Sequence, residues 1–246
     1  MKRYLLIPLV IFCASLILIN CEKDKDNSNS CKIIRQDIIS DSDTGSIEYT
    51  YDSKGRITKT DYGEGLYTTY SYASSEITKK DYTSNAITGT TVYSLIDGLA
   101  TTATYTKAGS SNSSNITTYE YDYDGYLEHE TTIKTSDAND VDETWYYYDD
   151  GNLTSKDREH TNSTTDFYSE TEYEYYTDKP NKSSVYFSFM GKQNTNLVKK
   201  QVYTFNYDNT INTVYAYEFN SDNYVIKTTQ TMGTTMTVFV PVYDCN

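Results

Sequence analysis

Acidic side chains are the most abundant groups in this sequence that could perform chemistry. The chain has 35 aspartate and glutamate residues. Two carboxylates about 5 to 10 Å apart are the usual machinery of glycoside hydrolysis, so the composition allows a glycan hydrolase. No pair is distinguished by its spacing, and acids that alternate along one segment, such as Glu172 and Glu174, equally serve to keep a surface soluble. A hydrolase therefore remains an alternative.

Other catalytic arrangements are missing from the sequence. The two histidines of the chain, His129 and His160, stand beside acidic residues, and neither has another histidine or a cysteine at metal-ligand spacing. The sequence contains no G-x-S-x-G, H-E-x-x-H or P-loop motif. We predict no catalytic residues, no cofactor and no enzymatic activity.

One acidic group has the ligand type of a calcium site without its spacing. It lies in the segment 136–143, which we expect to be a loop, and consists of Asp137, Asp140, Asp142 and Glu143. Asp41 and Asp43 form a second, smaller group. Neither group has the twelve-residue pattern of a calcium loop. We predict no metal site and keep the first group as the calcium candidate.

An aromatic run offers the chemistry of ligand stacking. Trp145, Tyr146, Tyr147 and Tyr148 follow one another, and rigid amphipathic rings of this kind stack on sugars. The mature chain has 27 of the 28 tyrosines, and most of them must form the core of a protein that is poor in leucine. The run 145–148 is the candidate ligand-stacking site.

The elements that position these residues are β-strands. Strong helix formers are scarce, whereas β-branched and aromatic residues abound. Period-two alternation gives many segments one aromatic face and one charged or threonine-rich face, as where Tyr119 and Tyr121 alternate with Thr118 and Glu120. The sequence predicts an all-β protein.

A short repeat divides the chain into hairpins. YDSKGRI at 51–57 aligns with YDYDGYL at 121–127 and FNSDNYV at 219–225, and 148–153 is one residue shorter. In each unit an Asp or Asn side chain can bond the backbone ahead, and Gly or Asn tolerates the left-handed turn position. Spacings of about 20 to 30 residues leave room for two strands between units.

About fourteen to sixteen antiparallel strands cannot remain a flat sheet with exposed edges, so the hairpin meander should close into a barrel or curve strongly. Both strand faces carry charges or hydroxyls, whereas a transmembrane barrel needs a continuous apolar outer band. We predict a water-soluble barrel with a tyrosine-rich interior. Further loops are expected at 107–115 and 177–184.

The N-terminus predicts export. A basic start and the apolar stretch 5–19 fit a secretory signal better than a membrane span, with a signal-anchor helix as the alternative. The segment 18–21 resembles the lipobox of bacterial lipoproteins, although Asn20 departs from the usual small residue. This resemblance implies removal of residues 1–20, lipidation of Cys21 and attachment to the outer membrane.

The polar segment 21–30 should form a tether, and its acids at 22–26 resemble the surface-export signal of Bacteroidetes-type lipoproteins. That resemblance implies the cell surface, with a spacer on the periplasmic face as the alternative. Removing Lys2 and Arg3 leaves 19 basic residues against 35 acidic ones, a formal charge of −16. Such a surface repels nucleic acid and anionic headgroups. Membrane contact should therefore come from the lipid alone.

Residues 31–246 should form one domain. Its two cysteines, Cys31 and Cys245, stand at the two ends, where an oxidising compartment favours a disulfide. Two free thiols are the alternative.

The repeat units resemble the YD repeats of Rhs-type proteins. Together with the lipobox, the chain is similar to Bacteroidetes lipoproteins whose domain of unknown function is porin-like in fold. This resemblance implies a multi-strand β shell and assigns no catalytic residue. We expect a non-catalytic binding or scaffold protein of the cell envelope with a glycan or an envelope protein as ligand. A glycan hydrolase and a structural surface or adhesion component are the alternatives.

Overall fold

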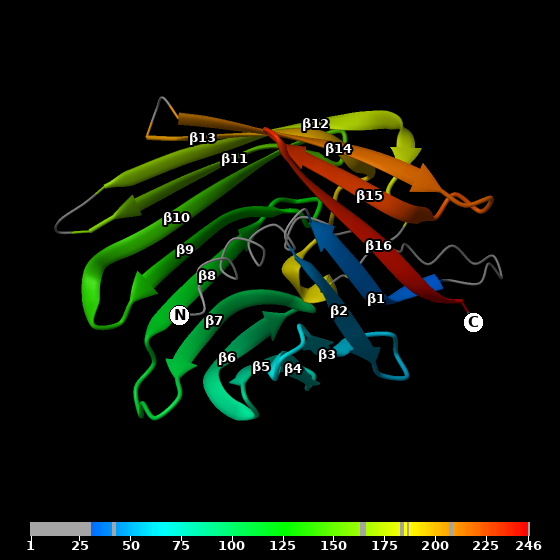
Figure 1. The fold of residues 1–246 in the computed structure, drawn as a ribbon. Coiled ribbons are helices and arrows are strands. Elements are labelled where there is room, and N and C mark those ends of the chain that lie inside the picture. Colours follow the sequence, from blue (N-terminus) through cyan, green and yellow to red (C-terminus); the bar gives the residue numbers. More distant parts are fainter. Residues whose placement is uncertain are drawn as a thin grey trace, which may run out of the picture.

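The computed structural model describes residues 31–40, 43–162, 166–182, 185, 187–206 and 209–245. The expected signal, Cys21 and tether lie outside these residues. The described chain forms one closed antiparallel barrel of sixteen strands (Figure 1). The strands are β1 (Cys31–Ser40), β2 (Thr44–Tyr51), β3 (Ile57–Asp61), β4 (Leu66–Tyr72), β5 (Glu76–Thr83), β6 (Ala86–Ile96), β7 (Leu99–Lys107), β8 (Asn115–Tyr121), β9 (Leu127–Lys134), β10 (Asp137–Asp149), β11 (Asn152–Thr161), β12 (Phe167–Pro180), β13 (Asn196–Phe205), β14 (Asn209–Phe219), β15 (Val225–Met232) and β16 (Thr235–Cys245), with the 3-10 helix η2 (Ser188–Met190) between β12 and β13.

Each strand pairs with its neighbours in sequence, and β1 pairs with β16. Closure thus leaves no free edge for aggregation. The predicted antiparallel hairpin meander is confirmed, and so is its closure. No helix in the described part of the chain has the length and hydropathy of a membrane span.

The expected loops are confirmed only in part. The connection 108–114 lies where a loop was predicted, but 136–143 is wrong because β10 begins at Asp137 and includes most of that segment. The third expected loop begins too early, since β12 continues to Pro180. Polar residues misled these predictions because both faces of this barrel wall accept them.

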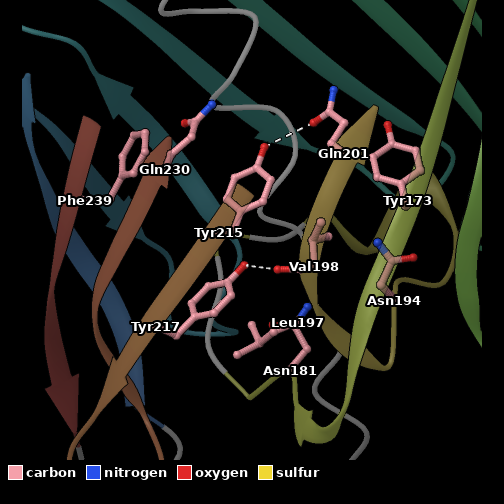
Figure 2. A pocket seen from close by; sticks show the side chains of 10 residues that line it. All are labelled: Tyr173, Asn181, Asn194, Leu197, Val198, Gln201, Tyr215, Tyr217, Gln230 and Phe239. Atoms are coloured by element: carbon pink, nitrogen blue, oxygen red, sulfur yellow. Dashed lines mark hydrogen bonds between the residues drawn. The ribbon is translucent and has the colours of Figure 1, made fainter. Parts of the chain in front are cut away.

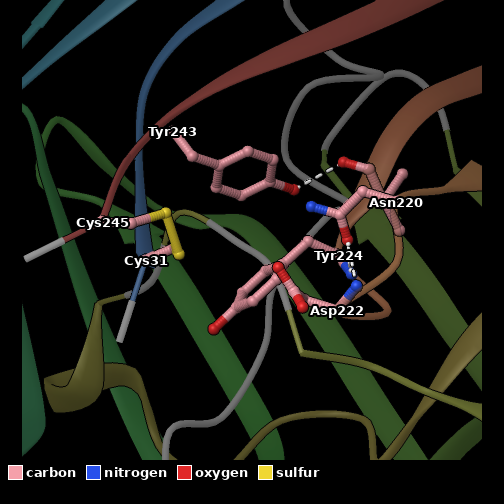
Figure 3. The surroundings of a disulfide bond; sticks show 7 residues. Cys31, Asn220, Asp222, Tyr224, Tyr243 and Cys245 are labelled. Carbon is pink, nitrogen blue, oxygen red and sulfur yellow. Dashed lines mark hydrogen bonds between the residues drawn. A yellow bond between two sulfur atoms is a disulfide. The ribbon is translucent and has the colours of Figure 1, made fainter. Parts of the chain in front are cut away.

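The repeat units fold as their residues predict. Asp52 Oδ1 accepts hydrogen bonds from the backbone N–H groups two and four residues ahead, both at 2.9 Å. Asn220 Oδ1 makes the same two bonds at 3.0 and 2.9 Å (Figure 3). Gly55 and Asn223 occupy the left-handed position with φ of 77° and 62°. These side chains replace backbone partners that a tight turn leaves free.

Because the strands alternate in direction, the turns fall at two ends of the barrel. The connections from even to odd strands share one end, which we call the YD end; besides the longer connection between β12 and β13, they are 52–56, 73–75, 97–98, 122–126, 150–151 and 220–224. The opposite end, which we call the open end, carries the connections from odd to even strands. β1 begins and β16 finishes at the YD end, where the paired Cys31 and Cys245 are joined by a disulfide (Figure 3).

Tyrosines on the inner face tie the wall together near the YD end. Each lies at or near the end of an even strand and donates its hydroxyl to a backbone carbonyl of the preceding odd strand. The five bonds, of 2.7 to 2.9 Å, are Tyr51 to Ile33, Tyr72 to Ile57, Tyr175 to Leu153, Tyr217 to Val198 and Tyr243 to Val225. Burial raises the pKa of Tyr51 and Tyr72 to about 12, so both remain donors at neutral pH.

Removing the disulfide should destabilise the barrel chiefly through the unfolded chain. The bond closes a loop of 214 residues, for which the chain-entropy relation gives an upper value of about 5 kcal/mol. We expect the double variant Cys31→Ser, Cys245→Ser to lose up to that free energy of unfolding, measured by urea denaturation.

Mass spectrometry of the unreduced, unfolded wild type provides the control. Alkylation of both Cys31 and Cys245, each on its own peptide, would show that the bond is not formed in the purified protein.

Candidate binding site in the barrel lumen

A segment between β12 and β13 crosses the interior of the barrel. We call residues 187–195 the inner segment; it includes η2 (Figure 1). The ring of Phe187 lies 4.8 Å from that of Tyr70 on β4. β4 and β12 are eight strands apart in a ring of sixteen, so they belong to opposite walls. The inner segment therefore spans the lumen.

Backbone hydrogen bonds fasten the inner segment to the turns of the YD end. The N–H of Lys192 donates to the carbonyl of Gly125 at 2.8 Å, and that of Thr195 to Gly151 at 3.0 Å. At Gly191, whose φ is 92°, a Cβ atom would come within 2.9 Å of the Gly125 oxygen. Only glycine fits this close approach. The segment thus forms a floor at the YD end.

Apolar side chains pack under this floor. Phe189, Ile77 and Ala100 are buried together, with 5%, 2% and 0% of their surface exposed. Partly buried rings surround them, and the ring of Tyr93 meets Phe189 edge-on at 5.0 Å. This cluster joins one wall to the inner segment, so the floor has a hydrophobic anchor.

Above the floor, the inner face of β9 to β11 carries charged groups. Arg158 Nε and Nη2 bond the two carboxylate oxygens of Asp142 at 2.6 and 2.8 Å. His160 Nδ1 lies 3.3 Å from Asp142 Oδ2. Burial raises the pKa of Asp142, but the hydrogen bonds and charge of Arg158 outweigh it and leave that pKa below its ordinary value. This paired group lies toward the open end.

Glu130, Tyr146 and Lys156 lie deeper on the same wall. Burial raises the pKa of Glu130, while hydrogen bonds from Tyr146 and Thr144 and the charge of Lys156 oppose that rise. Burial also lowers the pKa of Lys156. Tyr119 opposes Glu130 in the β8–β9 register. Aromatic rings thus alternate with charged groups around this part of the lumen.

Beside this wall is a small cavity without charged residues (Figure 2). It is lined by Tyr173, Asn181, Asn194, Leu197, Val198, Gln201, Tyr215, Tyr217, Gln230 and Phe239. Tyr215 donates to Gln201 at 3.1 Å. The volume of about 20 Å³ suffices for one water. Amide and hydroxyl groups here are suited to neutral hydroxyl ligands.

The structure does not bring the aromatic run 145–148 together. Alternation along β10 puts Tyr146 and Tyr148 in the lumen, and Trp145 and Tyr147 on the outer wall. Trp145 stacks on His129 with ring centroids 5.1 Å apart, and Tyr147 is 48% exposed. One ligand therefore cannot contact all four. The period of two that identified the strands also separates these rings.

The calcium candidates are separated, except that Asp140 and Asp142 both lie beside the ring of His160, at 3.8 and 3.3 Å from its nitrogens. Asp142 faces the lumen with Arg158, whereas Glu143 is on the outer wall, 3.5 Å from His129. Asp140 pairs with Lys134 at 2.9 Å, and Asp137 accepts a backbone N–H at 3.1 Å. Within the described ranges, no three His, Cys, Asp or Glu residues form a group that could hold a metal.

Sequence reasoning missed the inner segment and the lumen charges. The inner segment lacks a period-two pattern, and its aromatic residues, Phe187 and Phe189, resemble strand residues. Lys156 and Arg158 alternate with Asp157 on β11, which signals a strand without indicating which face is inside.

Solved structures with the same fold come from Bacteroides. A porin-like protein of Bacteroides vulgatus ATCC 8482 matches with a TM-score of 0.64 and 17% identity, covering 87% of this chain and 98% of that one. One from Bacteroides uniformis ATCC 8492 gives a TM-score of 0.62 and 17% identity over 86% and 96%. The fold of this chain is therefore porin-like.

The other comparisons show no further relationship. TcdB2-TccC3-Cdc42 matches with a TM-score of only 0.30 and 12% identity, over 79% of this chain and 12% of that one, so relationship to YD-repeat proteins stays a prediction. No protein-family model matches the sequence, and no curated protein does.

Replacing Arg158 by Gln should raise the pKa of Asp142, because burial would then act against a weaker opposing interaction. A carboxyl whose folded pKa is depressed contributes stability above its ordinary value of 3.8, and that stability is lost as the pH falls through the lowered value. The variant should lack part or all of this stability at neutral pH, because its Asp142 pKa is no longer held as far below 3.8. NMR titration of Asp142 measures the shift.

Lys200→Gln, which removes an outer-wall partner of Glu174, provides the control and should leave Asp142 unchanged. An unaltered Asp142 titration in Arg158→Gln would contradict the assignment.

Proposed function

We propose that this protein is a non-catalytic binding protein of the cell envelope, tethered by a lipid on Cys21, which takes glycan ligands into the barrel lumen. The observation that carries the proposal is the lumen wall, where tyrosine rings alternate with hydrogen-bonding and charged groups above a closed floor. Rigid rings and convergent polar groups are the chemistry of carbohydrate recognition.

The outer wall supports a barrel that stands in water. It carries ion pairs such as Lys59–Asp61 and Lys227–Glu218, each at 2.7 Å, and in the middle of β12 and β13 Lys200 lies 3.3 Å from Glu174. A wall in contact with lipid needs an apolar band instead. Attachment would then depend on the lipidated cysteine expected from the lipobox, at the outer membrane and in the cell-surface orientation.

The position of Cys31 supports an orientation for the tethered barrel. The described chain enters the barrel at the YD end, so a tether preceding Cys31 holds that end toward the membrane. The open end then faces away from it. Ligands would enter there, pass Arg158 and Asp142, and reach Glu130 and Lys156 above the floor.

The lipid anchor predicts a change of fractionation. Cys21→Ala should remove the lipid mass and, once residues 1–20 are cleaved, move the protein from the membrane fraction to the soluble fraction, because the lipid is the anchor that remains after cleavage. Mass spectrometry of the purified chain measures the modification. Cys13→Ala is the matched control and should leave both properties unchanged; an unmodified Cys21 in the wild type would refute the anchor.

Binding in the lumen predicts a contrast between neighbouring residues. Tyr146→Ala should weaken glycan binding by about tenfold or more, because a stacking ring in the lumen is lost. Tyr147→Ala, on the outer wall, should leave affinity within about twofold. The wild type is first screened on a broad glycan panel, hits are measured by calorimetry, and circular dichroism verifies folding.

The same panel discriminates the alternatives. Absence of glycan binding would overturn the proposal and favour an envelope-protein partner or a structural role. Release of reducing sugars would favour a hydrolase. One observation favours that second candidate: Glu130 and Asp142 lie on adjacent strands facing the lumen, and their pKa values are shifted in opposite directions. Glu130→Gln should then abolish release.

A further inference from the structure

Lys156 is a lumen cation without a close ion pair, on which Glu130 acts only as a more distant charge. Two other lumen cations are paired: Lys79 lies 3.2 Å from Asp81, and Arg158 holds Asp142. Within the described ranges, no carboxylate oxygen lies within 4.0 Å of Lys156 Nζ. A charge on a partly buried wall gains most from a counter-charge, because water screens it poorly there.

The surroundings of Lys156 offer an aromatic ring and polar groups to a ligand. It opposes Tyr146 on β10 and Thr171 on β12, so a ring and a hydroxyl flank it along the wall. The cavity that includes Tyr173 adjoins this position, since Tyr173 follows Thr171 by two residues on the same face of β12. Hydroxyl and amide partners are therefore close to the cation.

We propose that Lys156 binds the carboxylate of an acidic sugar unit within an otherwise neutral glycan. This inference rests on the proposed function and specifies its ligand class. Burial lowers the pKa of Lys156, and a bound carboxylate would oppose that lowering. Glu130, held by Tyr146 and Thr144, then accepts hydrogen bonds from the hydroxyls of the adjacent sugar.

The charge distribution limits the ligand to isolated carboxylates. The mature chain has a formal charge of −16 by the count above, so the outer wall repels a polyanion. A single acidic unit experiences less repulsion and finds Lys156 inside without a close ion pair. An aldobiouronic disaccharide, one glucuronic acid linked to a neutral sugar, is therefore the appropriate probe.

The test compares this disaccharide with the same compound after reduction of its carboxyl group to an alcohol. Purified wild-type protein should bind the acid at least about tenfold more tightly, the range of a charge-assisted hydrogen bond. Lys156→Met should remove that preference, whereas Lys156→Arg should retain part of it. Lys80→Met, on the outer wall, is the matched control and should retain all of it.

Equal affinity of the wild type for the two disaccharides, absence of binding to both, or an acid preference that persists in Lys156→Met would each overturn the inference. Lys156→Gln repeats the test if Lys156→Met does not fold. Binding of neutral glycans on the panel without any acid preference would leave the proposed function intact and refute only this ligand class. Absence of all glycan binding would refute both.

Discussion

The width of the barrel determines most of the structure. A sheet of sixteen strands encloses more space than its inward side chains can fill, so such barrels contain water or another part of the chain. In this protein a part of the chain, the inner segment, crosses the lumen. Tyrosine combines a long ring with a terminal hydroxyl, and Tyr51 and Tyr217 use that hydroxyl to bond carbonyls of the wall. The inner segment fills what remains at the YD end.

The same width explains why charges tolerate the interior. In a narrow, dry core, Arg158 and Asp142 would have to repay a large desolvation cost. Here their side chains remain 40% and 28% exposed, which lowers that cost. The bidentate hydrogen bonds between them offset what remains of it. The desolvation cost of charges inside this barrel is therefore low enough for them to take part in recognition. The hydrophobic cluster around Phe189 supplies the packing that the charged wall lacks.

The features that sequence reasoning predicted are those encoded locally. Each repeat unit has its own Asp or Asn and its own left-handed residue, so these hairpins could be identified without knowledge of the rest. Closure of the barrel could be predicted because free strand edges are unfavourable. A barrel closed in this way brings its first and last strands together, and with them the two end cysteines. In contrast, the path of the inner segment depends on contacts eight strands apart, such as Phe187 with Tyr70, and no local pattern encodes these.

Whether a residue faces the lumen or the outside could be predicted only in part from the sequence. Alternation separates Tyr146 from Tyr147, but an alternating sequence specifies two faces without stating which is inner when both are polar. In ordinary sheets the apolar side identifies the core. Here β11 displays Lys156 and Arg158 inward and Asp157 outward, so charge gives no indication. The contact of Tyr121 with the inner segment fixes the inner face of β8, and register transfers that choice from strand to strand. The inward-facing residues of such a barrel can therefore be identified only from the closed structure. Once the strand register is known around the whole ring, one contact with the inner segment fixes which face of every strand is inside.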